Sequence, residues 1–274
     1  MTNEYEKVKE RMRFDHEEIK KKFMEGLDMV AKRLKKVKTK IAVMSGKGGV
    51  GKSTVAALLA IHYGRNGYRT GIMDCDFWGS SIPRIFGVTK KRPVLTGEEI
   101  EPVHTDRWGI AIMSIQFFLP SESAPVVWRG PLVSGVIRDM LAKTNWGELD
   151  YLIFDLPPGT GDVPITILQE IRPNGVVLVA TPQELTTVIV EKSLIMAQEL
   201  ETAIVGLIEN MCYYECPQCG HREYIFGKGR GSEIASKYRI PFYTEIPIDP
   251  VLTKLVDSGK IEAFDTDYFE GFPL

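Results

Sequence analysis

The segment from Ser45 to Thr54, SGKGGVGKST, has the residue types and spacing needed to bind the phosphates of a nucleotide. It fits the pattern G-x-x-x-x-G-K-[ST], with an apolar, partly β-branched segment before it and a helical pattern after it. Glycines let backbone N–H groups turn toward the phosphates, and the N-terminus of the helix adds partial positive charge. We expect Lys52 to contact the β- and γ-phosphates and the Ser53 hydroxyl to bind Mg²⁺. The expected nucleotide-binding residues are Gly46, Lys47, Gly48, Gly49, Val50, Gly51, Lys52, Ser53 and Thr54.

Two further segments place carboxylates where such a site needs them. Asp74 and Asp76 end the apolar run IMDCD, and Asp155 ends the strand in LIFDLPPGTGD. Ligands of open parallel sheets bind at the carboxyl ends of the strands, and Mg²⁺ prefers hard oxygen ligands. Asp155 is therefore a candidate Mg²⁺ ligand, with Asp74 and Asp76 at the same edge of the sheet, and the Pro-Pro-Gly after Asp155 is a candidate sensor of the γ-phosphate. Asp74 is either structural or part of the same site, and Cys75 is expected to be a small buried residue.

The segment MCYYECPQCGHREYIFG, residues 211–227, holds three of the four cysteines of the chain. Cys216 and Cys219 have C-x-x-C spacing, whereas zinc and iron–sulfur sites usually take four protein ligands. A thioredoxin-like pair would open a helix, but the residues after Cys219 lack helical character. Two interpretations stay open. Cys212, Cys216, Cys219 and His221 could hold a structural zinc within one chain, or two C-x-x-C loops could meet on a dimer axis and supply four thiolates.

The composition is that of an ordinary globular protein. The chain has 274 residues, of which 44% are hydrophobic and 26% are charged, and its formal net charge is −2. No stretch has the 18 or so uninterrupted apolar residues of a membrane span, and the charged first residues lack the apolar core of a secretory signal. We expect a cytoplasmic protein that binds neither membranes nor nucleic acids. Four cysteines in a chain of this length favour metal binding over a disulfide framework.

The elements that must position these residues alternate between strands and helices from Lys40 onward. Strand patterns occupy residues 40–45, 69–76, 108–115, 149–159, 174–182, 203–211 and 241–247, and helical patterns occupy 52–67, 130–147, 186–201 and 229–239. This alternation predicts right-handed βαβ units. The expected fold is α/β, a P-loop NTPase with a mostly parallel sheet covered by helices on both faces.

We divide the chain into three parts. Residues 1–39 form a charged helical segment with twelve Lys and Arg against eight Asp and Glu, which either lies on the domain surface or docks a partner or nucleic acid. Residues 40–262 form the ATPase domain with its C-x-x-C loop at 211–227, and residues 263–274 form an acidic, aromatic tail. Apolar residues recur at near-helical spacing in the first part: Val8, Met12, Phe23, Leu27, Val30 and Leu34.

Lys47 gives the phosphate-binding loop the form K-G-G-V-G-K-S-T, which resembles the deviant Walker A motif of the ParA/MinD and nitrogenase iron protein group. In that group the added lysine reaches across a dimer to the nucleotide of the partner. The resemblance therefore implies a homodimer with ATP at its interface and catalytic roles for Lys47 and Lys52. It also implies that Asp76 lies in the first switch segment and helps to position the attacking water and Mg²⁺.

Over roughly residues 40–260 the chain resembles the Mrp-type (ApbC) branch of these ATPases, which are cytosolic iron–sulfur cluster carriers and scaffolds. The segments that carry the resemblance are GKGGVGKST, DCDFWGSSIPRIFG, VVWRGPLVSG, FDLPPGTGD, ENMCYYECPQCG and IPIDP. The resemblance implies that Asn210 contacts adenine and that Pro247 and Asp249 line the same pocket. Cys212 departs from the pattern, because a small residue such as serine is expected there.

We therefore expect an ATP-hydrolysing homodimer that binds an iron–sulfur cluster at its interface and transfers it to apo iron–sulfur proteins. Its expected ligands are ATP, Mg²⁺ and a [4Fe–4S] cluster that Cys216 and Cys219 of each chain bridge, and zinc could take the place of the cluster. The alternative is a MinD/ParA-like positioning ATPase with a structural zinc knuckle, which predicts a surface that binds a membrane or DNA.

Overall fold

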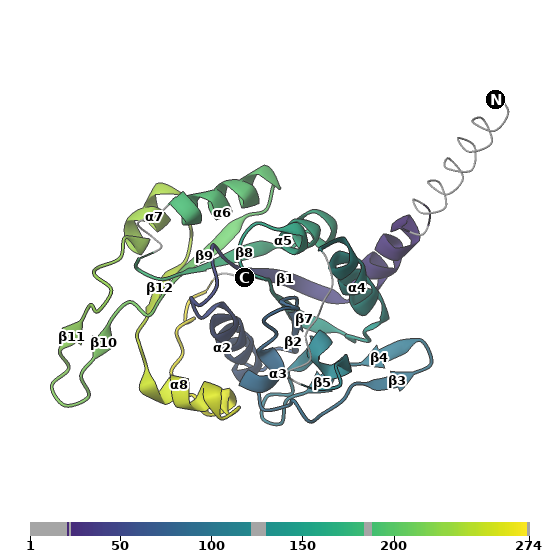
Figure 1. Ribbon diagram of the computed structural model, residues 1–274, viewed down its shortest axis with the longest axis horizontal. Coiled ribbons are helices and arrows are strands. Elements are labelled where there is room, and N and C mark those ends of the chain that lie inside the picture. Colours follow the sequence, from purple (N-terminus) through teal and green to yellow (C-terminus); the bar gives the residue numbers. More distant parts are fainter. Residues whose placement is uncertain (1–20, 22, 122–129, 184–187, 273–274) are drawn as a thin grey trace.

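A computed structural model of the chain describes residues 21, 23–121, 130–183 and 188–272. The strands of its central sheet are β1 (Val37–Ser45), β2 (Thr70–Asp74), β5 (Val103–His104), β6 (Ala111–Ser114), β7 (Leu149–Asp155), β8 (Gly175–Ala180), β9 (Ile204–Asn210) and β12 (Tyr243–Ile246). They lie in the order β12-β9-β8-β1-β7-β2-β6-β5 (Figure 1). All neighbours are parallel except the edge pair of β5 and β6. The mostly parallel sheet expected from the sequence is confirmed.

Helices cover both faces of this sheet (Figure 1). The core on one face includes residues of α2 (Lys52–Arg65), α3 (Ile82–Ile85), α8 (Pro250–Asp257) and η4 (Ile261–Ala263). The core on the other face includes residues of α4 (Gly130–Lys143), α5 (Asp162–Thr166), η2 (Ile167–Ile171), α6 (Val188–Glu199) and α7 (Gly231–Lys237). A short helical turn, η1 (Ile115–Phe118), follows β6. Successive side chains of β1 alternate between the two cores, because a strand has a side-chain period of two.

Two small hairpins leave the central sheet. One pairs β3 (Val94–Thr96) with β4 (Glu99–Glu101), and the other pairs β10 (Tyr214–Glu215) with β11 (Arg222–Glu223). The second hairpin lies within the cysteine-bearing segment and projects from the body of the molecule beyond β9 and β12 (Figure 1). No helix in the described part of the chain is long and apolar enough to cross a membrane.

The beginning of the fold lies earlier than the expected boundary at residue 40. β1 starts at Val37, and a helix over residues 23–34 precedes it. Val30 and Leu34 of that helix are 3% and 5% exposed and belong to the core that also contains α4. The C-terminal part of the charged segment is therefore packed onto the domain, whereas Val8 and Met12 lie outside the described residues.

The end of the fold lies later than expected. Phe264, Phe269 and Phe272, from the segment assigned to a tail, are buried in the core that contains α2. His62 Nδ1 of α2 lies 2.8 Å from an Asp267 carboxylate oxygen, and Arg65 donates hydrogen bonds to two carbonyls of the same segment. The aromatic residues of the tail thus complete the hydrophobic core over α2.

Candidate functional site

The phosphate-binding loop connects β1 to α2 and borders a cavity of about 920 Å³. Gly49 and Gly51 have φ angles of 84° and 79°, a left-handed region that favours glycine. A Cβ atom on Gly51 would lie 2.2 Å from Asn210 Nδ2, so a larger residue does not fit there. The expected loop residues that line the cavity are Lys47, Gly48, Gly49, Gly51, Lys52, Ser53 and Thr54. Val50 instead packs into the core and is 2% exposed.

Lys52 is held in a buried ion pair at the start of α2. Its Nζ lies 2.6 Å from Asp155 Oδ1, 3.3 Å from Ser53 Oγ and 4.0 Å from Asp76 Oδ2. The side chains of Lys52 and Asp155 are 6% and 0% exposed. The sequence assigned these four residues to one site, and the fold brings them together at the carboxyl ends of β7 and β2.

The donor atoms around Asp155 suit Mg²⁺. Asp155 Oδ2 is buried and has no hydrogen-bond partner among the described residues, so one hard oxygen is left for a cation. Nowhere in the described ranges do three or more His, Cys, Asp or Glu side chains gather into a metal site. A Mg²⁺ ion bound by Asp155, Ser53 and Asp76 would therefore complete its shell with water and nucleotide oxygens, as Mg²⁺ commonly does.

Asp74 has a structural role, which the sequence left open. It is fully buried, and its Oδ2 accepts hydrogen bonds from Ser80 Oγ at 2.6 Å and Ser114 Oγ at 3.2 Å. Its Oδ1 accepts the backbone N–H of Asp76 at 3.2 Å. Burial, and next the charge of Asp155, raise the pKa of Asp74. Asp74 thus fixes the turn that carries Asp76.

Asp76 follows this turn and faces the phosphate cavity. Its Oδ1 accepts the backbone N–H of Gly79 at 3.0 Å, and burial raises the pKa of its carboxyl. Cys75 is fully buried, as expected from the sequence. On the opposite wall, Pro157 and Pro158 line the cavity, and Gly159 donates its N–H to Ser45 O at 2.9 Å. The Pro-Pro-Gly segment therefore lies against the phosphate-binding loop.

A second cavity of about 230 Å³ adjoins the first. Asn210, Pro247 and Asp249 all line it, so the fold brings together the three residues that the resemblance assigned to an adenine pocket. The two cavities share Gly51, Thr54 and Val256 in their walls. A nucleotide with its phosphates on the loop can therefore place its base in the second cavity.

Asn210 and Asp249 also make hydrogen bonds within the protein that the sequence did not reveal. Asn210 Nδ2 donates to Val50 O at 2.8 Å and so braces the phosphate-binding loop. Asp249 Oδ1 accepts the backbone N–H groups of Val251 and Leu252 and caps the N-terminus of α8. Both side chains therefore shape the pocket.

Cys216 and Cys219 lie on a tight turn at the end of the projecting β10–β11 hairpin. The N–H of Cys216 donates to His221 O at 2.9 Å, and the N–H of Gly220 donates to Cys216 O at 2.8 Å. The backbone N–H groups of Gln218 and Cys219 lower the pKa of the Cys216 thiol, because they stabilise its thiolate. Cys219 is exposed and Cys216 is half-buried. The turn thus presents two thiols at the surface, one of them favoured as thiolate, the form that binds metals.

The structure argues against a zinc site within one chain. Cys212 is 2% exposed, and its Sγ donates to Ile246 O at 3.2 Å. Burial raises the pKa of this thiol to about 12. The His221 side chain is 71% exposed and pairs with Glu223 at 3.5 Å. Cys212 and His221 are therefore not gathered with Cys216 and Cys219, as the single-chain interpretation required.

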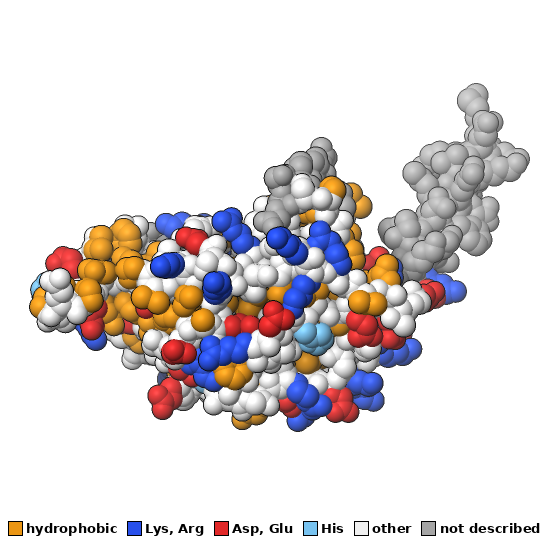
Figure 2. Space-filling model, turned by 90° about the horizontal axis from the view of Figure 1, so that it is seen from below, with side chains coloured by type: hydrophobic (Ala, Val, Ile, Leu, Met, Phe, Trp, Pro, Cys, Tyr) orange, Lys and Arg blue, Asp and Glu red, His pale blue; other side chains and the backbone are white. Residues whose placement is uncertain are grey.

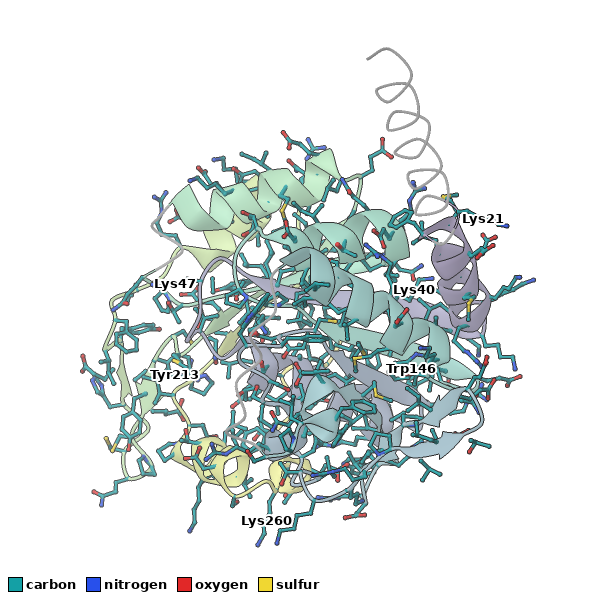
Figure 3. The ribbon with its side chains drawn as sticks, turned by 45° about the vertical axis from the view of Figure 1, so that its right-hand side comes forward. Lys21, Lys40, Lys47, Trp146, Tyr213 and Lys260 are labelled. Carbon is teal, nitrogen blue, oxygen red and sulfur yellow. The ribbon has the colours of Figure 1, made fainter. Side chains whose placement is uncertain are left out.

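The root of the cysteine loop is tied to the wall of the nucleotide cavities. Cys212 N–H donates to Ile246 O at 3.1 Å, and Ile248 N–H donates to Tyr213 O at 2.7 Å. Ile248 lines the second cavity and lies in the segment that leads into α8. Figure 3 shows Lys47 and Tyr213 on the same side of the molecule, away from Lys40 and Trp146.

Glu209 fixes the returning end of the same loop, and sequence reasoning missed it. It is 2% exposed, and its Oε2 accepts hydrogen bonds from the Gly231 N–H at 3.1 Å and from Tyr243 OH at 2.7 Å. A Cβ atom on Gly229 would collide with its carboxylate. The acidic residue directly before Asn210 was the available signal, because a buried carboxylate needs partners.

Comparison with known proteins agrees with this geometry. A sequence model of the ParA family, described as the NUBPL iron-transfer P-loop NTPase, matches residues 36–269. The chain belongs to this family. It is therefore a nucleotide-binding ATPase of the P-loop class, as the sequence predicted.

Individual relatives support the assignment. The chain is 46% identical over 231 residues to an iron–sulfur cluster carrier protein of Methanococcus maripaludis, a match that covers 84% of this chain and 80% of the relative. It is 44% identical over 230 residues to a protein of the same name from Aquifex aeolicus, with 84% of this chain and 63% of that protein covered. The chain thus spans less than two thirds of the Aquifex relative.

A solved structure is also similar. It is a nucleotide-binding protein from Archaeoglobus fulgidus in complex with ADP, 53% identical to this chain, with a TM-score of 0.83. The match covers 90% of this chain and 97% of that one.

Proposed function

We propose that this protein is a homodimeric ATPase that carries an iron–sulfur cluster between its two copies and delivers it to apo iron–sulfur proteins. The cluster is the cargo, and Cys216 and Cys219 of each copy bind it. The observation that carries this proposal is the surface turn with two thiols and no third ligand nearby in the described residues. A [4Fe–4S] cluster usually takes four thiolates, which two such turns supply.

The dimer is supported by the position of the loops. Lys47 lines the phosphate cavity, and the resemblance implies that it reaches the nucleotide of a second copy. Hydrophobic side chains gather at the end of the molecule that carries β10 and β11 (Figure 2). Ile225 and Phe226, two and three residues after the end of β11, are 56% and 41% exposed. A second copy that packs against this end would cover them and bring the two thiol pairs together.

In this proposal Lys52 and the loop N–H groups bind and orient the phosphates, and Asp76 positions the attacking water. Asp155, Ser53 and Asp76 would hold Mg²⁺, which neutralises charge that develops on the phosphates. Lys52 exchanges its contact with Asp155 for one with the nucleotide. This exchange would free Asp155 for the metal ion. Binding of the nucleotide to the loop and binding of the metal ion by Asp155 would therefore depend on each other.

Nucleotide binding is proposed to alter how tightly the cluster is held. The hydrogen bonds that join Tyr213 and Cys212 to the β12–α8 connection provide a physical link, because that connection also lines the base cavity. A shift of α8 on nucleotide binding would therefore move the root of the cysteine loop. The test is the rate of cluster transfer to an apo acceptor, with and without ATP. Equal rates would contradict the coupling, and Lys52→Ala should abolish any difference.

The cluster itself is tested by anaerobic reconstitution with iron and sulfide. We expect about four irons per dimer and none in the double variant Cys216→Ser/Cys219→Ser. Cys212→Ser is the matched control, because its thiol is buried and bonded to Ile246, and it should keep the full complement of iron. One zinc per chain that survives reconstitution would instead support the positioning ATPase with a zinc knuckle.

A further inference from the structure

The nucleotide cavity is also lined by an arginine, which lies within the segment DCDFWGSSIPRIFG but to which the resemblance assigned no role. Arg84 lines the same cavity as Lys52, from α3, the short helix that follows Asp76. Its neighbours Ile82, Pro83 and Ile85 are buried, whereas Arg84 is exposed. Arg84 and Ile85 are the residues of this helix that line the cavity, and Arg84 is the charged one.

The guanidinium of Arg84 has no protein partner within the described part of the chain. Of the ten other described arginines, Arg239 likewise has no side-chain partner in that part but does not line the cavity. The other nine donate side-chain hydrogen bonds to carboxylates or carbonyls: Arg33, Arg65, Arg69, Arg92, Arg107, Arg138, Arg172, Arg222 and Arg230. Asp257 lines the same cavity, yet no ion pair joins it to Arg84 among the described residues. A solvent-exposed fork of donors without a protein partner, beside a phosphate-binding loop, suits an anion.

The backbone of α3 is rigidly placed. Asp74 Oδ2 accepts the Ser80 hydroxyl at 2.6 Å just before the helix and lies 3.4 Å from the Ile82 N–H. After the helix, Gly87 packs against Gly259, and a Cβ atom on Gly87 would lie 2.4 Å from the Gly259 carbonyl oxygen. Arg84 is thus held between the switch segment and the end of α8.

The two cavities meet at a junction where Gly51, Thr54 and Val256 line both of them, and Arg84 lies beside the end of α8 that carries Val256. α8 contributes Val256 to both cavities, and the Arg84 carbonyl lies beside Gly259, two residues beyond the end of α8. A nucleotide with its base in one cavity and its terminal phosphates on the loop must pass its ribose and α-phosphate through this junction. Lys52 is expected to contact the β- and γ-phosphates, which leaves the α-phosphate for another cation.

We propose that Arg84 binds the α-phosphate of the nucleotide. It is a binding and positioning residue of the ATPase site, distinct from the two lysines of the phosphate loop. The proposal concerns nucleotide binding alone and does not depend on what the cysteine loop carries. The Arg84 proposal can therefore be correct even if the cluster proposal is wrong, and the cluster proposal can be correct even if the Arg84 proposal is wrong.

The test is calorimetric titration of adenosine, AMP and ADP into the wild type, Arg84→Gln and Arg84→Lys. A charge-assisted bond to the α-phosphate predicts that Arg84→Gln weakens AMP and ADP by the same factor, about tenfold, and leaves adenosine unchanged. Arg84→Lys should recover part of the loss, because it restores the charge without the fork. In steady-state assays Arg84→Gln should raise KM for ATP more than it lowers kcat.

Arg92→Gln is the matched control. Arg92 lies on the same segment, does not line the cavity, and donates to Thr89 O and Lys91 O. It should bind all three ligands as the wild type does. Unchanged ADP affinity in Arg84→Gln would show a solvated surface arginine and overturn the proposal. A loss confined to ADP, or one that extends to adenosine, would overturn the assignment to the α-phosphate.

Discussion

Replacing Lys52 by methionine should destabilise the nucleotide-free protein as well as abolish its ATPase activity. Lys52 Nζ lies 2.6 Å from Asp155 Oδ1, and the two side chains are 6% and 0% exposed. Removal of one partner from such a buried pair leaves the other charge without compensation, which costs about 3–5 kcal/mol of unfolding free energy. The second buried oxygen of Asp155 already lacks a hydrogen bond among the described residues, so nothing in its surroundings replaces the lysine.

The destabilisation should depend on pH in a defined direction. Burial and Asp155 raise the pKa of Asp74, and Lys52 opposes this, so the substitution raises that pKa further. A carboxyl whose pKa is higher in the folded than in the unfolded state favours folding at low pH and loses that contribution as pH rises toward the folded value. The deficit of Lys52→Met should therefore stay constant while the pH lies below the folded pKa of Asp74 in the wild type, about 7, and should grow as the pH rises above it.

Urea unfolding without nucleotide measures both effects. Lys38→Met is the matched control, because Lys38 pairs with Asp150 at 2.8 Å but is 71% exposed, and an exposed pair contributes about 1 kcal/mol at most. The double variant Lys52→Met/Asp155→Asn should regain much of the loss, since the uncompensated charge is gone. If Lys52→Met unfolds with the same free energy as Lys38→Met, the buried pair does not stabilise the site as argued.

Three further outcomes follow from the geometry. In the native protein, iodoacetamide should modify Cys216 and Cys219 but not Cys212. As the pH is raised, the rate of Cys216 modification should reach its plateau at a pH below the ordinary thiol pKa of 9.0. Mass spectrometry measures both results. Phe269→Ala should lower the unfolding free energy by about 3–5 kcal/mol in urea, because this side chain is 1% exposed in the core; an unchanged midpoint would place it on the surface. Asn210→Ala should cost about 1 kcal/mol in thermal unfolding, because a carbonyl of the phosphate loop loses its donor. The same variant should narrow the preference for ADP over GDP in calorimetry, and an unchanged preference would contradict the adenine assignment.

The sequence predicted the sheet and the phosphate site because both depend on local patterns. Apolar runs of strand length mark β1, β7 and β8, and glycine spacing marks the loop after β1. The carboxylates at strand ends meet because parallel strands end at one edge of the sheet. Spacing and strand ends, together with the resemblance that singled out Asp76, therefore predicted that Lys52, Asp76 and Asp155 would lie together.

The parts that the sequence did not predict depend on distant contacts. Val30 and Phe269 looked like members of peripheral segments, but each fills a core that only the folded sheet creates. Cys212 stayed open as a zinc ligand in the single-chain interpretation, because the sequence does not reveal that its thiol donates to the distant Ile246 carbonyl. Trp128 and Arg129, in a motif that pointed to the family branch, lie outside the described residues.

The central claim is that one iron–sulfur cluster bridges two copies of this chain. Native mass spectrometry of the anaerobically reconstituted protein tests it most directly, since it weighs the assembly and its cargo together. The account predicts a species of two chains with one [4Fe–4S] cluster, which Cys216→Ser/Cys219→Ser converts to metal-free chains and Cys212→Ser leaves intact. A single chain that holds its own metal, or a dimer that retains the cluster without Cys216 and Cys219, would contradict it.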